Sequence, residues 1–376
     1  MTLPAVGGVL LEQFFSREFV QGLLLHALPA LFPFLLAAAA TIGLVPIAIL
    51  VAPRLGLMKE PGDRHIHLRP TPEIGGLAIY LAFAVAVVAY VPISRPVVGM
   101  LGVGGAAALV LMIDDRFKLP ARAKILIQAG LALLAMFGFG YLISGITLPV
   151  VGLVQLGLLA VPLTLFWLLS MQNTVNILDG VDGLAAGVVG IVAVVLAIAA
   201  ASRSHEEAVL LAAALAGCCF GFLVFNFNPA RIFMGDSGSH FLGITVGMLT
   251  IFGVAKGVVL FALVLPVLAL AIPIADTAWA IIRRRRQGVS IAHRDTRHIH
   301  YQLLDFGLSQ RQTCLVMYSG TAILGSLGLM LFGHRRILSV AIVVLVVAVS
   351  TAIGEQIERA NWRVPAPGLK RLLGSE

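Results

Sequence analysis

Long apolar runs recur along this 376-residue chain and constrain its fold more than any other feature. About 20 apolar residues in a helix cross a bilayer core of ~30 Å. Hydrophobic residues make up 59% of the chain and charged residues 12%, whereas a soluble domain has about 45–50% and about 25%. A segment inside a bilayer must satisfy its own backbone hydrogen bonds, so it forms a helix or part of a closed barrel. The runs lack the alternation of barrel strands and therefore predict an all-α, polytopic integral membrane protein.

The apolar runs predict about eleven transmembrane helices within a membrane domain at 28–354. An N-terminal interfacial segment at 1–27 precedes this domain, and a cytoplasmic tail at 355–376 follows it. We expect no cleavable signal peptide, because the first residues carry acidic Glu12 and Glu18 and lack a basic region. The expected spans are 28–52, 75–94, 96–113, 123–145, 148–171, 184–201, 207–226, 239–255, 257–282, 312–332 and 337–354.

The positive charges lie mainly in the loops on one side of the predicted membrane domain. The net charge is +8, but its concentration in short loops favours the positive-inside rule over nucleic-acid binding. This rule places the N-terminus outside and the loops that follow the odd-numbered spans in the cytoplasm. We therefore expect a multi-pass protein of the bacterial inner membrane with its active-site loops on the cytoplasmic face.

Five carboxylates lie beside apolar helix ends on the predicted cytoplasmic side. Carboxylates close to hydrocarbon are costly and usually functional. Clusters of Asp and Asn oxygens suit hard cations such as Mg²⁺ or Mn²⁺. Each acid taken singly is also consistent with a helix cap or a dipole partner, but five on one face favour a metal site. They are Asp114, Asp115, Asp179, Asp182 and Asp236.

Two histidine pairs, His65/His67 and His298/His300, lie among arginines on the same side. Their basic surroundings favour an anionic phosphate ligand. The Arg283–Arg286 run is more typical of a membrane-surface anchor. These residues together predict an enzyme at the cytoplasmic membrane face that binds a metal, a diphosphate substrate and a lipid.

The ordered motifs resemble the polyprenyl-phosphate N-acetylhexosamine-1-phosphate transferase family (glycosyltransferase family 4) over roughly residues 30–355. The motifs are Asp114-Asp115, the stretch from Asn173 to Gly183, Phe233 to Gly238, and Arg297 to Leu303, with Arg64 to His67 before them. The stretch from Arg297 to Leu303 is similar to that of the undecaprenyl-phosphate N-acetylglucosaminyl 1-phosphate transferases of bacteria. The peptidoglycan branch instead has consecutive histidines followed by an acidic residue.

The resemblance implies a Mg²⁺- or Mn²⁺-dependent transfer of N-acetylglucosamine 1-phosphate from UDP-GlcNAc to undecaprenyl phosphate, with release of UMP. Such a step begins the synthesis of O-antigen, common antigen or teichoic acid linkage units. It also implies roles for individual residues. Asp114 and Asp115 would be catalytic, and Asn176 and Asp236 would bind the metal. The implied substrate-binding residues are Lys124, Asn173, Asp179, Asp182, His67, Arg297, His298 and His300.

Two departures from the family pattern leave the sugar open, since His65 replaces a lysine and Tyr301 replaces a histidine. Other acetamido sugars on UDP remain alternatives, as does the phospho-MurNAc-pentapeptide of the peptidoglycan branch. A transporter of lipid-linked sugars is the alternative from another class. It should have polar residues in mid-span, but most spans are clean there and Asp276 and His240 are the exceptions. Membrane lipids are expected partners, nucleic acid is not, and the peptidoglycan branch suggests a homodimer by analogy alone.

Overall fold

The computed structural model describes residues 28–60, 70–148, 152–201, 204–254, 270–286 and 298–330. These residues are mainly α-helical, as predicted, with two short antiparallel strand pairs. The helices are α3 (Leu28–Leu55), α4 (Gly75–Tyr90), α5 (Arg95–Phe117), α6 (Ala121–Leu133), α7 (Ala160–Leu178), α8 (Leu184–Ala201), α9 (Glu206–Asn226), α10 (Gly235–Val254), α12 (Ala271–Arg286), α13 (Ile299–Asp305) and α14 (Gln310–Met330). A π-helical turn, Leu134–Gly138, extends α6, and a 3₁₀ turn, Gly157–Leu159, precedes α7. The strand pairs are β1 (Met58–Lys59) with β2 (Thr71–Pro72), and β3 (Gly145–Leu148) with β4 (Gly152–Gln155).

Six helical segments of the described chain are long and apolar enough to cross a membrane. They are Leu28–Leu55, Arg95–Phe117, Ala121–Gly138, Gly157–Leu178, Leu184–Ala201 and Glu206–Asn226. The number eleven is not confirmed and remains a prediction. The expected span at 337–354, the first part of the span at 257–282, and the segments 1–27 and 355–376 lie outside the described residues.

Several predicted boundaries were wrong, and the span expected at 123–145 ends already at Gly138. The span expected at 148–171 begins only at Gly157, because β3 and β4 occupy 145–155. Helix α5 continues past 113 to Phe117, and α7 continues past 171 to Leu178. Hydropathy ends a span where polar residues begin, whereas the backbone hydrogen bonds of a helix continue through them. Asp114, Asp115 and the α7 asparagines therefore lie in the last turns of helices rather than in loops.

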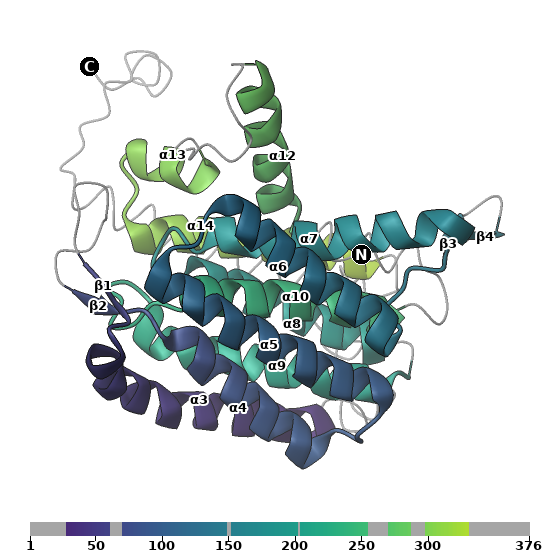
Figure 1. The fold of residues 1–376 in the computed structure, drawn as a ribbon, viewed down its shortest axis with the longest axis horizontal. Coiled ribbons are helices and arrows are strands. Elements are labelled where there is room, and N and C mark those ends of the chain that lie inside the picture. Colours follow the sequence, from purple (N-terminus) through teal and green to yellow (C-terminus); the bar gives the residue numbers. More distant parts are fainter. Residues whose placement is uncertain are drawn as a thin grey trace, which may run out of the picture.

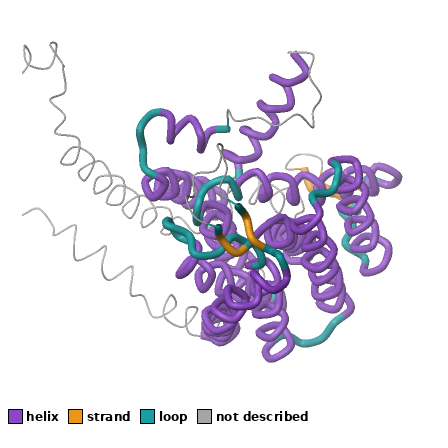
Figure 2. Tube along the Cα trace, turned by 60° about the vertical axis from the view of Figure 1, so that its left-hand side comes forward, coloured by secondary structure: helices purple, strands orange, loops and turns teal. Residues whose placement is uncertain are grey.

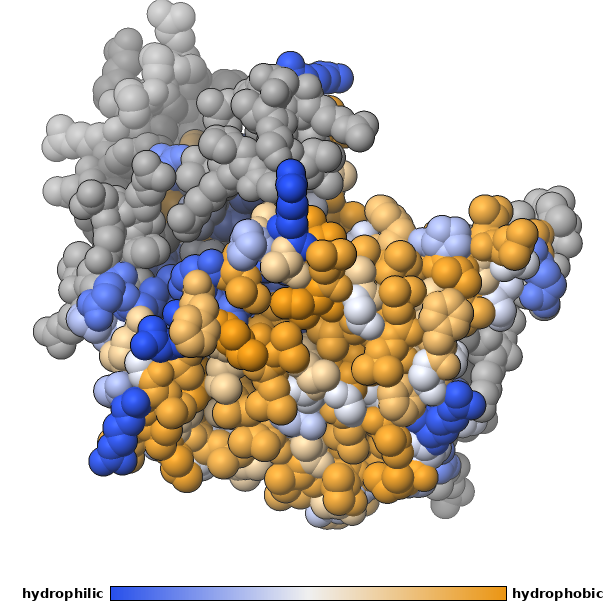
Figure 3. All heavy atoms as spheres, in the orientation of Figure 1, coloured by the Kyte–Doolittle hydropathy of each residue, from blue (hydrophilic) through white to orange (hydrophobic). Residues whose placement is uncertain are grey.

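Helix α10 lies in the middle of the bundle and packs against α4, α5, α7, α8 and α9 (Figure 1). Helix α9 also packs against α3 and α8, and α14 packs against α8. The view in Figure 3 shows a broad apolar surface. Exposed side chains of α4, α5 and α6 include Val88 (63%), Leu109 (51%) and Leu126 (73%). In water such a surface would be unfavourable, so lipid is its natural solvent.

A short parallel bridge joins the segment before α4 to the segment before α10. Glu73 pairs with Phe233, and the amides of Gly75 and Gly76 donate to the carbonyls of Phe233 and Met234, both at 2.9 Å. Figure 2 shows the β1–β2 pair beside several described loops at this part of the molecule. These bonds fix the position at which α10 begins.

Candidate active site

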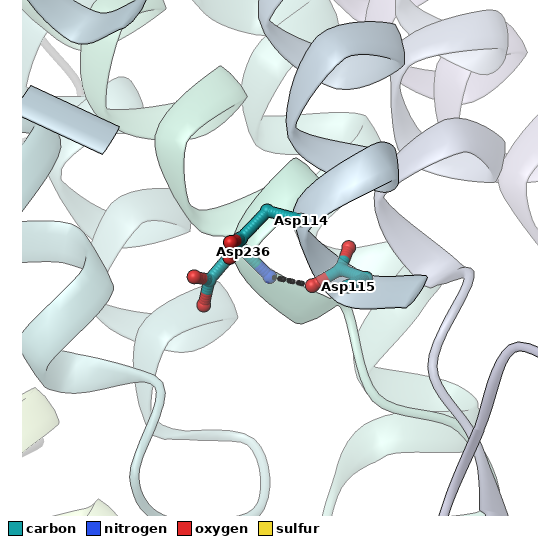
Figure 4. Close-up of side chains that lie close together, drawn as sticks. All are labelled: Asp114, Asp115 and Asp236. Carbon is teal, nitrogen blue, oxygen red and sulfur yellow. Dashed lines mark hydrogen bonds between the residues drawn. The ribbon is translucent and has the colours of Figure 1, made fainter. Parts of the chain in front are cut away.

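Three carboxylates from two helices meet where α5 ends and α10 begins (Figure 4). Asp114 and Asp115 lie in the last turns of α5, and Asp236 lies in the first turn of α10. One oxygen from each lies within 4.8 Å of the others. Asp114 and Asp115 are only 1% and 6% exposed, so this negative charge is largely removed from water.

Asp115 caps helix α10. Its Oδ1 accepts the backbone N–H of Asp236 at 2.7 Å, and its Oδ2 accepts that of Ser237 at 3.1 Å. The first amides of a helix have no partner within the helix, and the helix dipole favours a negative charge there. Gly235 precedes them with φ +71, and a Cβ at this position would lie 2.6 Å from Asp115 Oδ2. Only glycine allows this approach without strain.

Lys124 neutralises the other two carboxylates. Its Nζ lies 2.6 Å from Asp114 Oδ2 and 2.6 Å from Asp236 Oδ2. Asp114 Oδ1 also accepts the backbone N–H of Leu119 at 2.6 Å. Lys124 lies one turn into α6, directly after the connection from α5. The ammonium thus occupies the place where a cation would balance the two charges.

The two asparagines of α7 have different surroundings. Asn176 Nδ2 donates to Asp236 Oδ1 at 3.1 Å and to Ser239 Oγ at 3.0 Å, so its amide adjoins the carboxylates. Asn173 lies one turn earlier, where its Nδ2 donates to Gln128 Oε1 at 2.8 Å. The structure therefore places Asn176 with the carboxylate cluster and Asn173 in a polar contact with α6.

Asp179 and Asp182 follow α7 but make different contacts. Asp182 Oδ2 accepts hydrogen bonds from Asn228 Nδ2 at 3.0 Å and from the amide of Ala230 at 3.1 Å, so it holds the connection between α9 and α10. Asp179 lies nearer the carboxylate cluster. Burial raises its pKa well above the usual range, Lys59 opposes this, and the negative charge of Asp236 adds to it.

Lys59, Glu73 and Lys118 form a charged group beside the cluster that the sequence motifs did not single out. Glu73 is 5% exposed, and its carboxylate lies 3.1 Å from Lys59 Nζ and 3.3 Å from Lys118 Nζ. Burial lowers the pKa of Lys59, but Glu73 and then Asp179 raise it to a net value above the usual one. The sequence did contain a signal, since Glu73 is the one acidic residue between Arg69 and Arg95.

His298 is held by Asp276, which the sequence indicated only as an acid within a predicted span. Asp276 Oδ2 lies 2.9 Å from His298 Nδ1, and Oδ1 accepts the amide of Ile299 at 3.2 Å. The rings of His298 and His300 stack with centroids 5.7 Å apart. Burial, and secondly His298, lower the pKa of His300 to about 4 although Asp276 opposes them. His67 and Arg297 lie outside the described residues.

The turn after α7 lies against these histidines. A Cβ on Gly180 would come within 3.0 Å of His300 Nε2 and 2.8 Å of the Tyr301 hydroxyl. The missing side chain of Gly180 therefore allows α13 to approach the Asp179–Asp182 turn. This contact connects the histidine motif to the part of the chain that carries Asp179.

The donor set suits a divalent cation of the hard type. The three carboxylates offer oxygen ligands, which Mg²⁺ and Mn²⁺ prefer, and Asn176 adjoins them through its amide. Two of the carboxylates are buried, and a lone lysine balances the pair of Asp114 and Asp236. The residues present therefore fit such an ion.

Comparison with known proteins identifies the family of this chain. The family model described as Glycosyl transferase family 4 matches residues 97–254, which include the three clustered carboxylates. A Bacillus subtilis (strain 168) protein named "Probable undecaprenyl-phosphate N-acetylglucosaminyl 1-phosphate transferase" is 35% identical over 76% of this chain and 80% of its own length.

Two further relatives show the breadth of the similarity. The decaprenyl-phosphate N-acetylglucosaminephosphotransferase of Mycolicibacterium smegmatis is 34% identical over 79% of this chain and 82% of its own length. The phospho-N-acetylmuramoyl-pentapeptide-transferase of Moorella thermoacetica is 33% identical over 73% and 90%. With identity of this level across most of each relative, the chain belongs to glycosyl transferase family 4, the family of membrane phosphotransferases that act on polyprenyl phosphates, as its motifs predicted.

Proposed function

We propose that this protein transfers N-acetylglucosamine 1-phosphate from UDP-GlcNAc to undecaprenyl phosphate. An oxygen of the lipid phosphate forms a bond to the β-phosphorus of the UDP-sugar. The bond from that phosphorus to the oxygen bridging to the α-phosphorus breaks, and UMP leaves with this oxygen. The product is undecaprenyl-diphosphate-N-acetylglucosamine, the lipid carrier for an envelope polysaccharide such as O-antigen, common antigen or a teichoic acid linkage unit.

The observation that carries this proposal is the cluster of Asp114, Asp115 and Asp236 with Lys124 at one site. Transfer between two phosphates depends mainly on positioning and on neutralising charge, because little covalent chemistry is required of the protein. A site with buried carboxylates and a lysine meets that requirement if it also holds a divalent cation. The names of the relatives in the two N-acetylglucosamine groups support the sugar.

Each residue has a role in this account. Asp236 and Asn176 would hold Mg²⁺ or Mn²⁺, which when bound supplies positive charge to the diphosphate. Asp114 orients Lys124 toward the diphosphate. Its carboxylate is also the proposed base that accepts a proton from the lipid phosphate. Asp115 fixes Asp236 by capping α10. Asp179 and the His298–His300 segment face the nucleotide sugar, and we assign His67 and Arg297 to the same substrate from sequence alone.

Two assigned residues take modified roles in the proposal. Asn173 binds Gln128 and therefore positions α7 against α6. Asp182 positions the connection that leads to α10. Asn173 and Asp182 would therefore affect substrate binding indirectly, by positioning the segments that form the site. We place the protein in the bacterial inner membrane as a multi-pass enzyme with this site on the cytoplasmic face, where UDP-sugars are made available.

The test is release of UMP by purified protein given undecaprenyl phosphate, Mg²⁺ and a panel of UDP-sugars, with and without EDTA. The account expects lipid-dependent, EDTA-sensitive release from UDP-GlcNAc. Release only from UDP-MurNAc-pentapeptide would assign the chain to the other group of relatives, represented by the Moorella thermoacetica protein. Release only from another UDP-acetamido sugar would attribute specificity to departures such as Tyr301. If a folded protein released no UMP from any donor, the transferase proposal would be wrong and a lipid-linked sugar transporter would replace it.

A further inference from the structure

Asp276 is a buried carboxylate that the proposed chemistry leaves without a role. It lies on α12 and is 6% exposed. An isolated carboxylate in such surroundings is expensive, so its retention requires partners or a function. Both of its oxygens have a partner, and both partners belong to the histidine segment.

The first contact fixes the ring of His298. Nδ1 of His298 lies 2.9 Å from Asp276 Oδ2, and the ring is 5% exposed. A carboxylate can only accept, so Nδ1 carries the proton in this pair. A carboxylate behind a histidine sets its tautomer and orientation, and Nε2 is then the ring nitrogen that remains for a ligand.

The second contact fixes the start of α13. Asp276 Oδ1 accepts the amide of Ile299 at 3.2 Å, one of the amides that a helix leaves without an internal partner. His298, the N-cap residue, makes no side-chain cap hydrogen bond of its own. A residue from another helix therefore provides the cap, and it ties α13 to α12.

The positions of His298 and α13 in turn determine the contact of His300 with the turn after α7. His300 stacks on His298, and His300 Nε2 lies where Gly180 has no side chain. His300 is 1% exposed, and its Nε2 has no hydrogen-bond partner among the described residues. Rotation of His298 or a shift of α13 would displace His300 from the Asp179–Asp182 turn.

We infer that Asp276 is a positioning residue of the transfer reaction, which orients His298 and fixes α13 so that the histidine segment faces the nucleotide sugar. This inference rests on the proposed transferase function. Asp276 acts through His298 and does not contact the reacting phosphates. Its loss should therefore affect the donor more than the lipid acceptor.

The test compares Asp276→Asn with Thr277→Val in the UMP-release assay. Asn has nearly the same volume but only one acceptor, so either His298 Nδ1 or the Ile299 amide faces an NH₂ group. We expect kcat/KM for the UDP-sugar to fall roughly tenfold to hundredfold, mainly through KM, with KM for undecaprenyl phosphate unchanged. Among the residues that the structure describes, Thr277 Oγ1 bonds only to Pro273 O of its own helix, so Thr277→Val should retain wild-type values.

Two further measurements separate positioning from general damage. The double variant Asp276→Asn/His298→Gln should lose less activity than the sum of the two single losses, because both changes break the same Asp276–His298 contact. The cap on the Ile299 amide is lost only with Asp276. Hydrogen exchange of the 298–305 peptide should become faster in Asp276→Asn, while peptides of α8 and α9 should keep their wild-type protection. Additive losses, equal losses for both substrates, or unchanged exchange and activity would overturn the inference. An inactive wild-type protein would instead contradict the proposed function, and the exchange experiment would still test the Asp276 contacts.

Discussion

Asp115 Oδ1 accepts the backbone N–H of Asp236 at 2.7 Å, so one acid of the cluster caps the helix that carries another. The adjacent Asp114 faces Lys124 instead. Two neighbouring residues with the same side chain therefore have different surroundings at the end of one helix. This division supports the proposal that Asp115 maintains the geometry of the site and that Asp114 takes part in the reaction.

Replacing Asp115 should affect stability more than replacing Asp114. Asp115→Asn leaves one of two buried helix amides without an acceptor, which costs about 1–3 kcal/mol. Asp114→Asn retains an oxygen for the Leu119 amide and removes a buried charge, so its cost should be smaller. Thermal unfolding in detergent measures the stability of both variants. Both variants should also lose transferase activity. A Tm for Asp114→Asn below that of Asp115→Asn would contradict the assignment.

Gly235 should tolerate no side chain. Gly235→Ala places a Cβ 2.6 Å from Asp115 Oδ2 and forces an alanine to φ +71, and we expect it to destabilise the protein by about 2 kcal/mol or more. The matched control is Gly102→Ala in α5, where a Cβ would meet nothing within 4 Å. That change should be neutral or stabilising by up to about 1 kcal/mol. Equal Tm values for the two variants would refute the cap geometry.

Lys124 and a divalent cation should act on the same carboxylates. Lys124→Ala leaves Asp114 and Asp236 without their shared ammonium, which costs about 3 kcal/mol. Added Mg²⁺ should restore much of this stability, so its Tm increase should be larger in the variant than in the wild type. Arg122→Ala, an exposed change on the same helix, provides the control. An identical response to Mg²⁺ in all three proteins would show that the ion binds elsewhere.

His300 should make stability sensitive to acid. Its pKa of about 4 lies below the ordinary value of 6.5, so between these values the unfolded chain binds a proton that the folded chain does not. The free energy of unfolding should therefore fall as pH decreases from 6.5 to 4, by up to about 3 kcal/mol from this residue. The contribution is absent above pH 6.5. Unfolding of wild type and His300→Gln across this range measures the difference, which should shrink on acidification.

Much of the helical architecture was predictable because bilayer thickness imposes long apolar runs. The expected span 184–201 coincides with α8 at Leu184–Ala201, and 207–226 differs from α9 by one residue. The strands at 145–155 were missed because that stretch is apolar enough to continue a span, and hydropathy does not report the antiparallel pairing of β3 with β4 that replaces the helix. Hydropathy cannot distinguish these outcomes in a short apolar segment.

The site was predictable as a set of residue types but not as a set of contacts. Asp114, Asp115 and Asp236 come together from segments more than 100 residues apart, and acid-rich helix ends indicated this meeting. The separate environments of Asp114 and Asp115 depend on which way each side chain leaves α5. The pairing of Asp276 with His298 depends on the packing of α12 against the histidine segment. No local pattern in the sequence encodes either.

The most direct test of the central claim is UMP release from UDP-GlcNAc by the wild type and by Asp236→Ala, each with undecaprenyl phosphate and Mg²⁺. Asp236 contacts Lys124 and Asn176 and lies in the first turn of the capped helix, so its loss removes the centre of the cluster. We predict lipid-dependent UMP release by the wild type and none above background by the variant, with both proteins folded in detergent. Full activity in Asp236→Ala would contradict a reaction centred on these carboxylates.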